Sequence, residues 1–142
     1  ERGHARDLKQ AFKYFLTRGK PGYVPGRWAP LADAVRWIRG AGGTAVVAHP
    51  ARYKLTAGKL ARLLGEFKEC GGEAIEVVTG SHDAETCRHF GGLARERGLL
   101  ASVGSDYHGP GQSWCDLGQT LPLPEDCTPV WQAWAGRPAA VC

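Results

Sequence analysis

The stretch "LLASVGSDYHGP", residues 99–110, decides the fold class and points to a site. It opens with a short apolar run, which is typical of a buried strand. Gly104 and Gly109 bracket the polar residues that follow and allow the backbone to turn tightly. Between them Asp106 and His108 stand two positions apart, so in an extended segment both side chains point the same way. We therefore predict a strand that delivers a carboxylate and an imidazole to its carboxyl end.

Two more strands are expected upstream, in "TAVVA" (residues 44–48) and "EAIEVV" (residues 73–78). Segments with helical spacing of apolar residues precede, separate and follow these strands, and Ser81 is the expected N-cap of the helix between the second and third strands. The alternation predicts an α/β fold with about three parallel strands and flanking helices. Three parallel strands leave long edges uncovered, so we expect the sheet to continue in residues outside this chain or in a partner.

The two ends of the chain are more irregular. The apolar spacing in "HARDLKQAFKYFLTRGK", residues 4–20, predicts an amphipathic helix, and a loop rich in proline and glycine follows it. Near the other end, residues 117–121 are expected to form a short strand and residues 128–134 a final helix. In that helix Trp131 and Trp134 are expected to be packing residues.

Composition limits the class of protein. The cysteines number five, are irregularly spaced and form no CxxC pair, which argues against a disulfide scaffold or a zinc finger and favours a reducing, cytoplasmic compartment. No apolar run is long enough for a transmembrane helix, so no membrane partner is expected. The chain contains no methionine, from which we expect it to be a fragment of a longer protein.

The net charge of +4 permits an anionic substrate without requiring one. A solvated helical face is the structural alternative for the basic residues that gather near the start. These residues are Arg2, Arg6, Lys9, Lys13, Arg18, Lys20, Arg27, Arg36 and Arg39.

Ligand-capable residues follow the predicted strands. His49 comes directly after the first, and Asp106 and His108 follow the third. Taken singly, each has a structural alternative, since a histidine can be a hydrogen-bonded core residue and an aspartate a turn former. The carboxyl ends of parallel strands meet at one rim, and imidazole with carboxylate suits zinc, manganese or iron. Together the three residues favour a metal site.

Other polar residues are less specific. Glu76 lies within the second predicted strand, where it is either an inward polar residue near the rim or a salt-bridge partner below it. We hold it as a substrate-contact candidate. His82 and His89 are interpreted as structural residues on a helix face, and Cys115 has no base partner that would make it a nucleophile.

Three segments, "GGTAVVAHPARY", "GEAIEVV" and "LLASVGSDYHG", resemble the later strands of the PHP (polymerase and histidinol phosphatase) superfamily of metal-dependent phosphoesterases. The opening "ERGHARDLKQAFKYFLTRGKPGYVP" is similar to one branch, whose members dephosphorylate 3′,5′-bisphosphate nucleotides and trim short RNA from the 5′ end. This branch has Tyr where Phe15 stands here. The resemblance implies a distorted (β/α)7 barrel with two or three divalent metals, manganese first, with magnesium, zinc or iron as alternatives.

Residue by residue, the resemblance implies that His49, Asp106 and His108 are metal ligands in a catalytic cluster. His4 corresponds to a position near the substrate phosphate. Further candidates for contact with a nucleotide or RNA are Arg2, Arg52, Lys20, Tyr23 and Glu76, although packing is the stronger alternative for Tyr23.

One departure from the family pattern is large. PHP proteins begin with a His-x-His motif, and this chain has none. The chain therefore resembles the C-terminal half of the domain, with residues 1–28 as a helical segment and substrate loop and residues 29–142 as barrel. Its partner would be the N-terminal half. Three hypotheses stand: a nucleotide phosphatase or 5′ exoribonuclease, a PHP phosphatase for another small ester such as histidinol phosphate, and a non-catalytic fragment.

Overall fold

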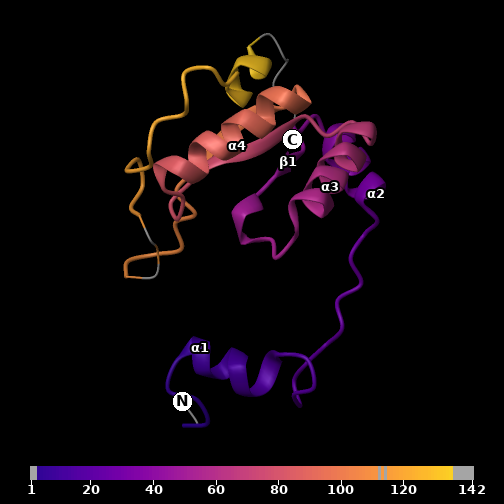
Figure 1. Cartoon of the computed structure of the whole chain (residues 1–142). Helices are drawn as coiled ribbons and strands as arrows, with labels where there is room; N and C mark the ends of the chain where they lie inside the picture. The colour runs from indigo at the N-terminus through magenta and orange to yellow at the C-terminus, as the bar shows by residue number, and fades with distance from the viewer. Residues whose placement is uncertain (1–2, 112, 114, 136–142) are drawn as a thin grey trace.

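The computed structural model describes residues 3–111, 113 and 115–135. Strands β1 (Val46–Val47), β2 (Ala74–Thr79) and β3 (Leu100–Gly104) form one sheet in the order β1-β2-β3, and both pairs are parallel (Figure 1). The predicted α/β class with three parallel strands is confirmed. β1 is shorter than the predicted segment 44–48, since only two of its residues pair with β2.

The helices α2 (Leu31–Gly40), α3 (Ala57–Glu69) and α4 (Ala84–Arg97) flank the sheet. α4 packs on β2 and β3, and α2 contacts α3. Together they enclose one apolar core, and β2 is buried along its whole length, as expected of a central parallel strand. The core contains Val35, Ala45, Val47, Leu64, Phe67, Ile75, Val77, Val78, Cys87, Phe90, Ala94, Leu99, Ala101 and Cys127.

The start of α4 differs from the prediction. The N-cap is Asp83 rather than Ser81, and its carboxylate accepts a hydrogen bond from the Thr86 backbone N–H at 2.8 Å. Ser81 lies in the turn that leaves β2, two residues too early to cap the first helical N–H groups. Hydrogen bonding to the Thr86 side chain, and then to the Thr86 backbone N–H, lowers the pKa of the Asp83 carboxyl. The charged cap suits the positive end of the helix dipole.

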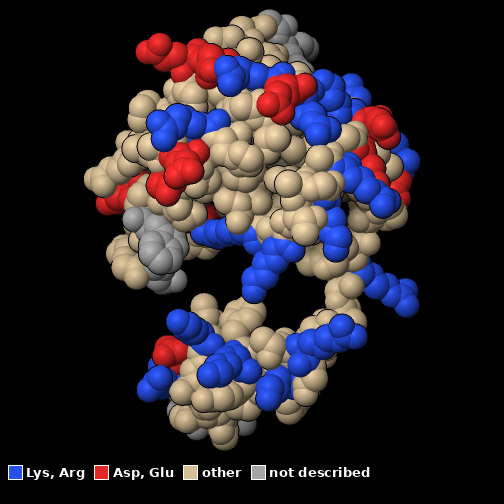
Figure 2. Space-filling model, in the orientation of Figure 1, with Lys and Arg blue, Asp and Glu red and all other residues tan. Residues whose placement is uncertain are grey.

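The N-terminal segment is separate from the sheet. In place of one helix over residues 4–20, there is a single α-helical turn α1 (Leu8–Ala11) followed by a π-helical turn η1 (Phe12–Leu16). Its apolar face is exposed, with Leu8 at 69% and Phe12 at 53%. An extended stretch joins it to α2 (Figure 1), and lysine and arginine gather on it (Figure 2). The predicted boundary between residues 1–28 and 29–142 stays a prediction.

The C-terminal part corrects two expectations. Residues 117–121 form turns and loop instead of a strand. The final helix is a 3₁₀ helix, η3 (Val130–Trp134), and its tryptophans are half exposed, Trp131 at 47% and Trp134 at 52%. Val130 is the residue that this helix buries. Among the described helices, none is long and apolar enough to cross a membrane.

Two core thiols give a test of this packing. Cys87 and Cys127 are buried, and burial raises the pKa of each thiol. Because the thiolate is the reactive form, we expect both to react about 100-fold more slowly with a disulfide reagent than partly exposed Cys115 in the native protein. Peptide mapping after timed labelling measures this. Equal labelling of Cys87 and Cys115 without denaturant would contradict the packing of α4.

Candidate functional site

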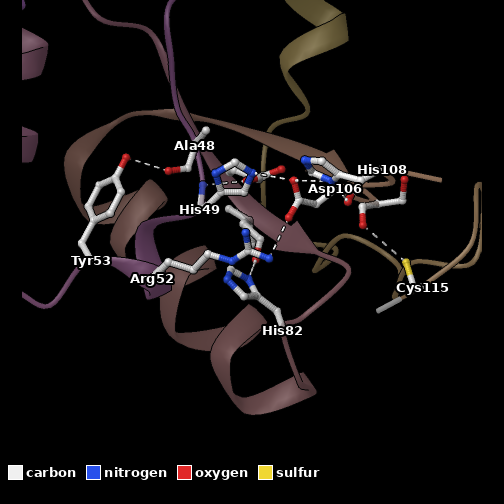
Figure 3. Close-up of polar contacts among 11 residues, drawn as sticks. Ala48, His49, Arg52, Tyr53, His82, Asp106, His108 and Cys115 are labelled. Atoms are coloured by element: carbon white, nitrogen blue, oxygen red, sulfur yellow. Dashed lines mark hydrogen bonds and ion pairs between the residues drawn. The ribbon is translucent and has the colours of Figure 1, made fainter. Parts of the chain in front are cut away.

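The carboxyl ends of the three strands bring polar side chains together. His49 follows β1 after one residue, Glu76 lies within β2, and Asp106 and His108 follow β3. Arg52 ends the 3₁₀ turn η2 (Pro50–Arg52), which starts directly after His49. Figure 3 shows His49, Arg52, Asp106 and His108 converging from these separate elements.

Two of these residues have an unusual backbone conformation. His49 has φ 47° and Asp106 has φ 54°, and they are the non-glycine residues with positive φ in the described part of the chain. The left-handed region is costly for residues with a Cβ, and such conformations concentrate at functional sites. At both positions the chain has just left a strand, so the unusual turn redirects each side chain toward the rim.

Asp106 is the centre of the cluster. Its Oδ1 lies 3.2 Å from His49 Nε2 and 3.8 Å from His108 Nδ1, while its Oδ2 lies 2.7 Å from Arg52 Nη2. The Asp106 side chain is only 13% exposed, whereas that of Arg52 is 46% exposed. The carboxylate is therefore fixed below the surface, and the guanidinium reaches it from the solvent side.

Glu76 lies beneath His49. It is 8% exposed, and its Oε2 accepts a hydrogen bond from the His49 backbone N–H at 2.7 Å and lies 3.8 Å from His49 Nε2. On β3, a Cβ at Gly104 would lie 2.8 Å from Glu76 Oε1, so the missing side chain there leaves room for the carboxylate. These contacts place the Glu76 carboxylate against His49, while its role as a support or a substrate contact stays a prediction.

His108 has one ring nitrogen committed and one free to bind. Its Nδ1 lies 2.7 Å from the Asp106 backbone carbonyl, which can only accept, so neutral His108 carries its proton on Nδ1. The Nε2 lone pair then remains available, as in histidines that ligate metals while a carbonyl holds the other nitrogen. Ser113 fixes the same loop, since its Oγ accepts from the His108 backbone N–H at 2.6 Å.

Tyr53 is a site residue that sequence reasoning missed. Its Oη donates a hydrogen bond to the Ala48 carbonyl at 2.7 Å, which ties the end of η2 to the strand end that carries His49. Burial, and then the negative charge of Glu76, raise the pKa of its phenol. The tyrosine therefore stays a neutral donor at physiological pH. A tyrosine directly after "HPAR" was the available signal, because it follows the turn that leaves His49.

The donor types fit a divalent metal, since imidazole and carboxylate ligands suit zinc, manganese and iron. Within the described ranges, however, no group of three or more His, Cys, Asp or Glu is arranged to hold an ion. Arg52 engages one Asp106 oxygen, and the His49 backbone engages Glu76 Oε2. The residues thus supply ligand atoms that suit a metal, and two of these oxygens, Asp106 Oδ2 and Glu76 Oε2, already contact other groups of the chain.

Comparison with known proteins identifies the relatives of this chain. It is 46% identical over 135 residues to the 3′,5′-nucleoside bisphosphate phosphatase of Chromobacterium violaceum. It is 42% identical over 134 residues to the 5′-3′ exoribonuclease Rnm of Escherichia coli. The chain is a homologue of these PHP phosphoesterases. This confirms the resemblance expected from the sequence.

The homology covers only part of each relative. The chain spans about half the length of the curated relatives it matches, 47% of the phosphatase and 45% of the exoribonuclease, while 95% and 94% of this chain is covered. No family model matches the chain.

Solved structures agree with the fold. An amidohydrolase from Chromobacterium violaceum, with bound sulfate and no metal, matches with a TM-score of 0.79 and 46% identity, over 94% of this chain and 46% of that one. A candidate metal-dependent phosphoesterase from Bifidobacterium adolescentis shares the fold with a TM-score of 0.59 and 23% identity, over 89% of this chain and 42% of that one.

The structure of this chain brings only some of the predicted site residues together. His49, Asp106, His108 and Arg52 converge at the rim (Figure 3), and the Glu76 carboxylate contacts His49 from below. Three other candidates, His4, Lys20 and Tyr23, are exposed on the N-terminal segment, apart from the sheet (Figure 1). Arg2 lies outside the described residues.

His82 corrects the prediction of a helix-face residue. It precedes α4, is 8% exposed and stacks on Phe90 at 5.5 Å between ring centroids. Its Nδ1 lies 2.9 Å from the Val77 carbonyl, so the ring fastens the turn after β2 to the strand. His89 lies on the exposed face of α4, as predicted.

Proposed function

We propose that the protein containing this chain is a metal-dependent phosphoesterase that removes phosphate from 3′,5′-bisphosphate nucleotides or from the 5′ ends of short RNA. The observation that carries the proposal is the meeting of two imidazoles, two carboxylates and a guanidinium at one rim. The relatives named above are hydrolases of nucleotides and RNA, which supports this substrate class.

Three residues would hold the metal: His49, Asp106 and His108. When bound, a divalent ion supplies charge neutralisation for a phosphoryl group and acidifies water near neutral pH. His108 would offer its Nε2 lone pair, because its Nδ1–H donates a hydrogen bond to the Asp106 carbonyl. Asp106 offers Oδ1, which already faces both imidazoles. Manganese is the first choice, with magnesium, zinc or iron as alternatives.

Glu76 and Tyr53 would position the ligands. Glu76 fixes the backbone at His49 and places a negative charge 3.8 Å from its Nε2. Tyr53, which follows η2, donates its Oη hydrogen bond to the carbonyl of Ala48, the residue before His49. Together they keep His49 in its left-handed conformation, so that the imidazole needs little reorganisation when it binds.

Arg52 is the phosphate-binding candidate that lies at the site. Its planar guanidinium offers five donors and suits a phosphate group, with which it pairs through two hydrogen bonds. The related Chromobacterium violaceum structure contains bound sulfate, an oxyanion that resembles phosphate. The basic residues of the N-terminal segment (Figure 2) are candidates for contact with a second phosphate or an RNA backbone.

The test is a substrate comparison on the intact protein with Mn²⁺. We expect kcat/KM for 3′,5′-bisphosphoadenosine to exceed that for histidinol phosphate by about 100-fold, because the second phosphate adds charge-assisted contacts. A short RNA with a 5′ phosphate, assayed by release of nucleotides, tests the exoribonuclease branch. The same reactions after metal removal provide the control.

The alternatives predict different outcomes. Comparable rates on both small esters would favour a phosphatase with another substrate. No turnover of any ester by metal-loaded protein would favour a non-catalytic role and overturn the proposal.

A further inference from the structure

The two oxygens of the Asp106 carboxylate have different neighbours. Oδ1 faces the imidazoles of His49 and His108, whereas Oδ2 contacts the guanidinium of Arg52 at 2.7 Å (Figure 3). A cation held at Oδ1 would share this carboxylate with the positive charge of the Arg52 guanidinium at Oδ2. Arg52 therefore occupies a position on Asp106 for which a cation would compete.

The two members of this ion pair differ in how freely they can move. The Asp106 side chain is 13% exposed and stands on a left-handed backbone, so its position is set by the fold. The Arg52 side chain is 46% exposed and long, so it can turn toward solvent. When the pair separates, Arg52 is the member that moves.

The backbone under Arg52 is held in place. Its N–H donates to the His49 carbonyl at 2.9 Å, and the next residue, Tyr53, donates its N–H to the Pro50 carbonyl at 3.2 Å and its Oη to Ala48. A change of partner then requires only side-chain rotation. Rotation of an exposed side chain is fast and needs no rearrangement of the sheet.

We propose that Arg52 is a latch, defined here as a side chain with two alternative partners. Without metal it pairs with Asp106, and when a divalent ion binds Asp106 it is released to bind the phosphate of the substrate. This inference rests on the proposed function and adds a coupling to it: metal binding and phosphate binding strengthen each other through one side chain.

The latch predicts opposite effects on two affinities, because Arg52 weakens metal binding and strengthens phosphate binding. Arg52→Gln removes the competing charge and should tighten Mn²⁺ binding by the metal-free intact protein about 2- to 5-fold, the effect of a partly exposed ion pair. The same variant, loaded with Mn²⁺, should bind inorganic phosphate about 10-fold more weakly. Isothermal titration calorimetry measures both affinities.

Arg62→Gln is the matched control. Arg62 also pairs with a carboxylate at 2.7 Å, that of Glu66, but on the exposed face of α3. The Arg62→Gln variant removes the same charge from an ion pair outside the cluster, so the affinities for Mn²⁺ and for inorganic phosphate should stay at the wild-type values. Arg52→Lys keeps the charge without the planar fork, so its Mn²⁺ affinity should lie between those of wild type and Arg52→Gln. This conservative variant keeps the test available if the glutamine variant does not fold.

The outcomes separate the latch from the proposed function. Opposite changes in the two affinities support the latch, while a purely structural role would weaken both. Unchanged or weakened Mn²⁺ affinity in Arg52→Gln, with normal binding by the wild type, overturns the latch and leaves the proposed function standing. Absence of Mn²⁺ binding by the wild-type intact protein overturns the proposed function itself.

Discussion

Replacing Asp106 with asparagine should lower kcat/KM of the intact protein about 1000-fold, because this carboxylate would both ligate metal and hold the imidazoles in register. Asparagine keeps the size of the side chain and tolerates the left-handed backbone at φ 54°. Alanine is a poorer choice, since it would add backbone strain to the loss of the carboxylate. Steady-state kinetics with Mn²⁺ on 3′,5′-bisphosphoadenosine measures the effect.

Stability is the necessary companion measurement for this variant. Arg52, which pairs with Asp106, is nearly half exposed. Loss of the ion pair should therefore change the free energy of unfolding by about 1 kcal/mol or less. Asp116→Asn is the control, since it removes a carboxylate from a nearby exposed loop, where Oδ1 accepts from the Leu117 N–H at 2.9 Å. Near-normal turnover of Asp106→Asn with metal bound would exclude Asp106 from catalysis.

Replacing Gly80 with alanine should destabilise the protein by about 3 kcal/mol and also lower activity, because there is no space for a side chain there. Gly80 follows directly after β2, and a Cβ would lie 2.3 Å from the Ser105 carbonyl oxygen and 2.9 Å from Cys115 Sγ. Ser105 immediately precedes Asp106. A methyl group at Gly80 would therefore push apart two strand ends of the site.

Gly65 provides the matched control for this effect. It lies within α3, and a Cβ there would meet nothing within 4 Å. Gly65→Ala should raise the free energy of unfolding by about 0.5 to 1 kcal/mol, because alanine loses less backbone entropy than glycine in a helix. Urea denaturation of the two variants gives both values. The close approach at Gly80 would be disproved by an alanine variant as stable as the wild type.

Local sequence was sufficient for several parts of the fold and the candidate site. The apolar runs before His49 and Asp106 predicted buried parallel strands, because such runs bounded by turn residues have few other structures available. The parallel arrangement then predicted that these two residues and His108 would meet, since the carboxyl ends of parallel strands share one rim. The structure brings them together, while their role as metal ligands stays a prediction.

Other parts depended on contacts between segments far apart in the chain. From its sequence Glu76 could be a rim residue or a support, and only the structure shows that its carboxylate accepts a hydrogen bond from His49, 27 positions away. His82 shares its turn with Ser81 and resembles a helix-face residue until Phe90 and the Val77 carbonyl enclose it. Neither contact has a local periodicity that a sequence pattern could display.

The sequence by itself determined where the strands end and which ligand-capable residues stand there, since both follow from apolar runs and their immediate neighbours. Tertiary structure alone decided that Asp106 shares its carboxylate between imidazoles and Arg52, and that His49 and Asp106 adopt left-handed backbones. The physical reason is that these features arise where separate strand ends meet. There, a side chain's partner is set by the packing of the sheet rather than by the residues beside it in the chain.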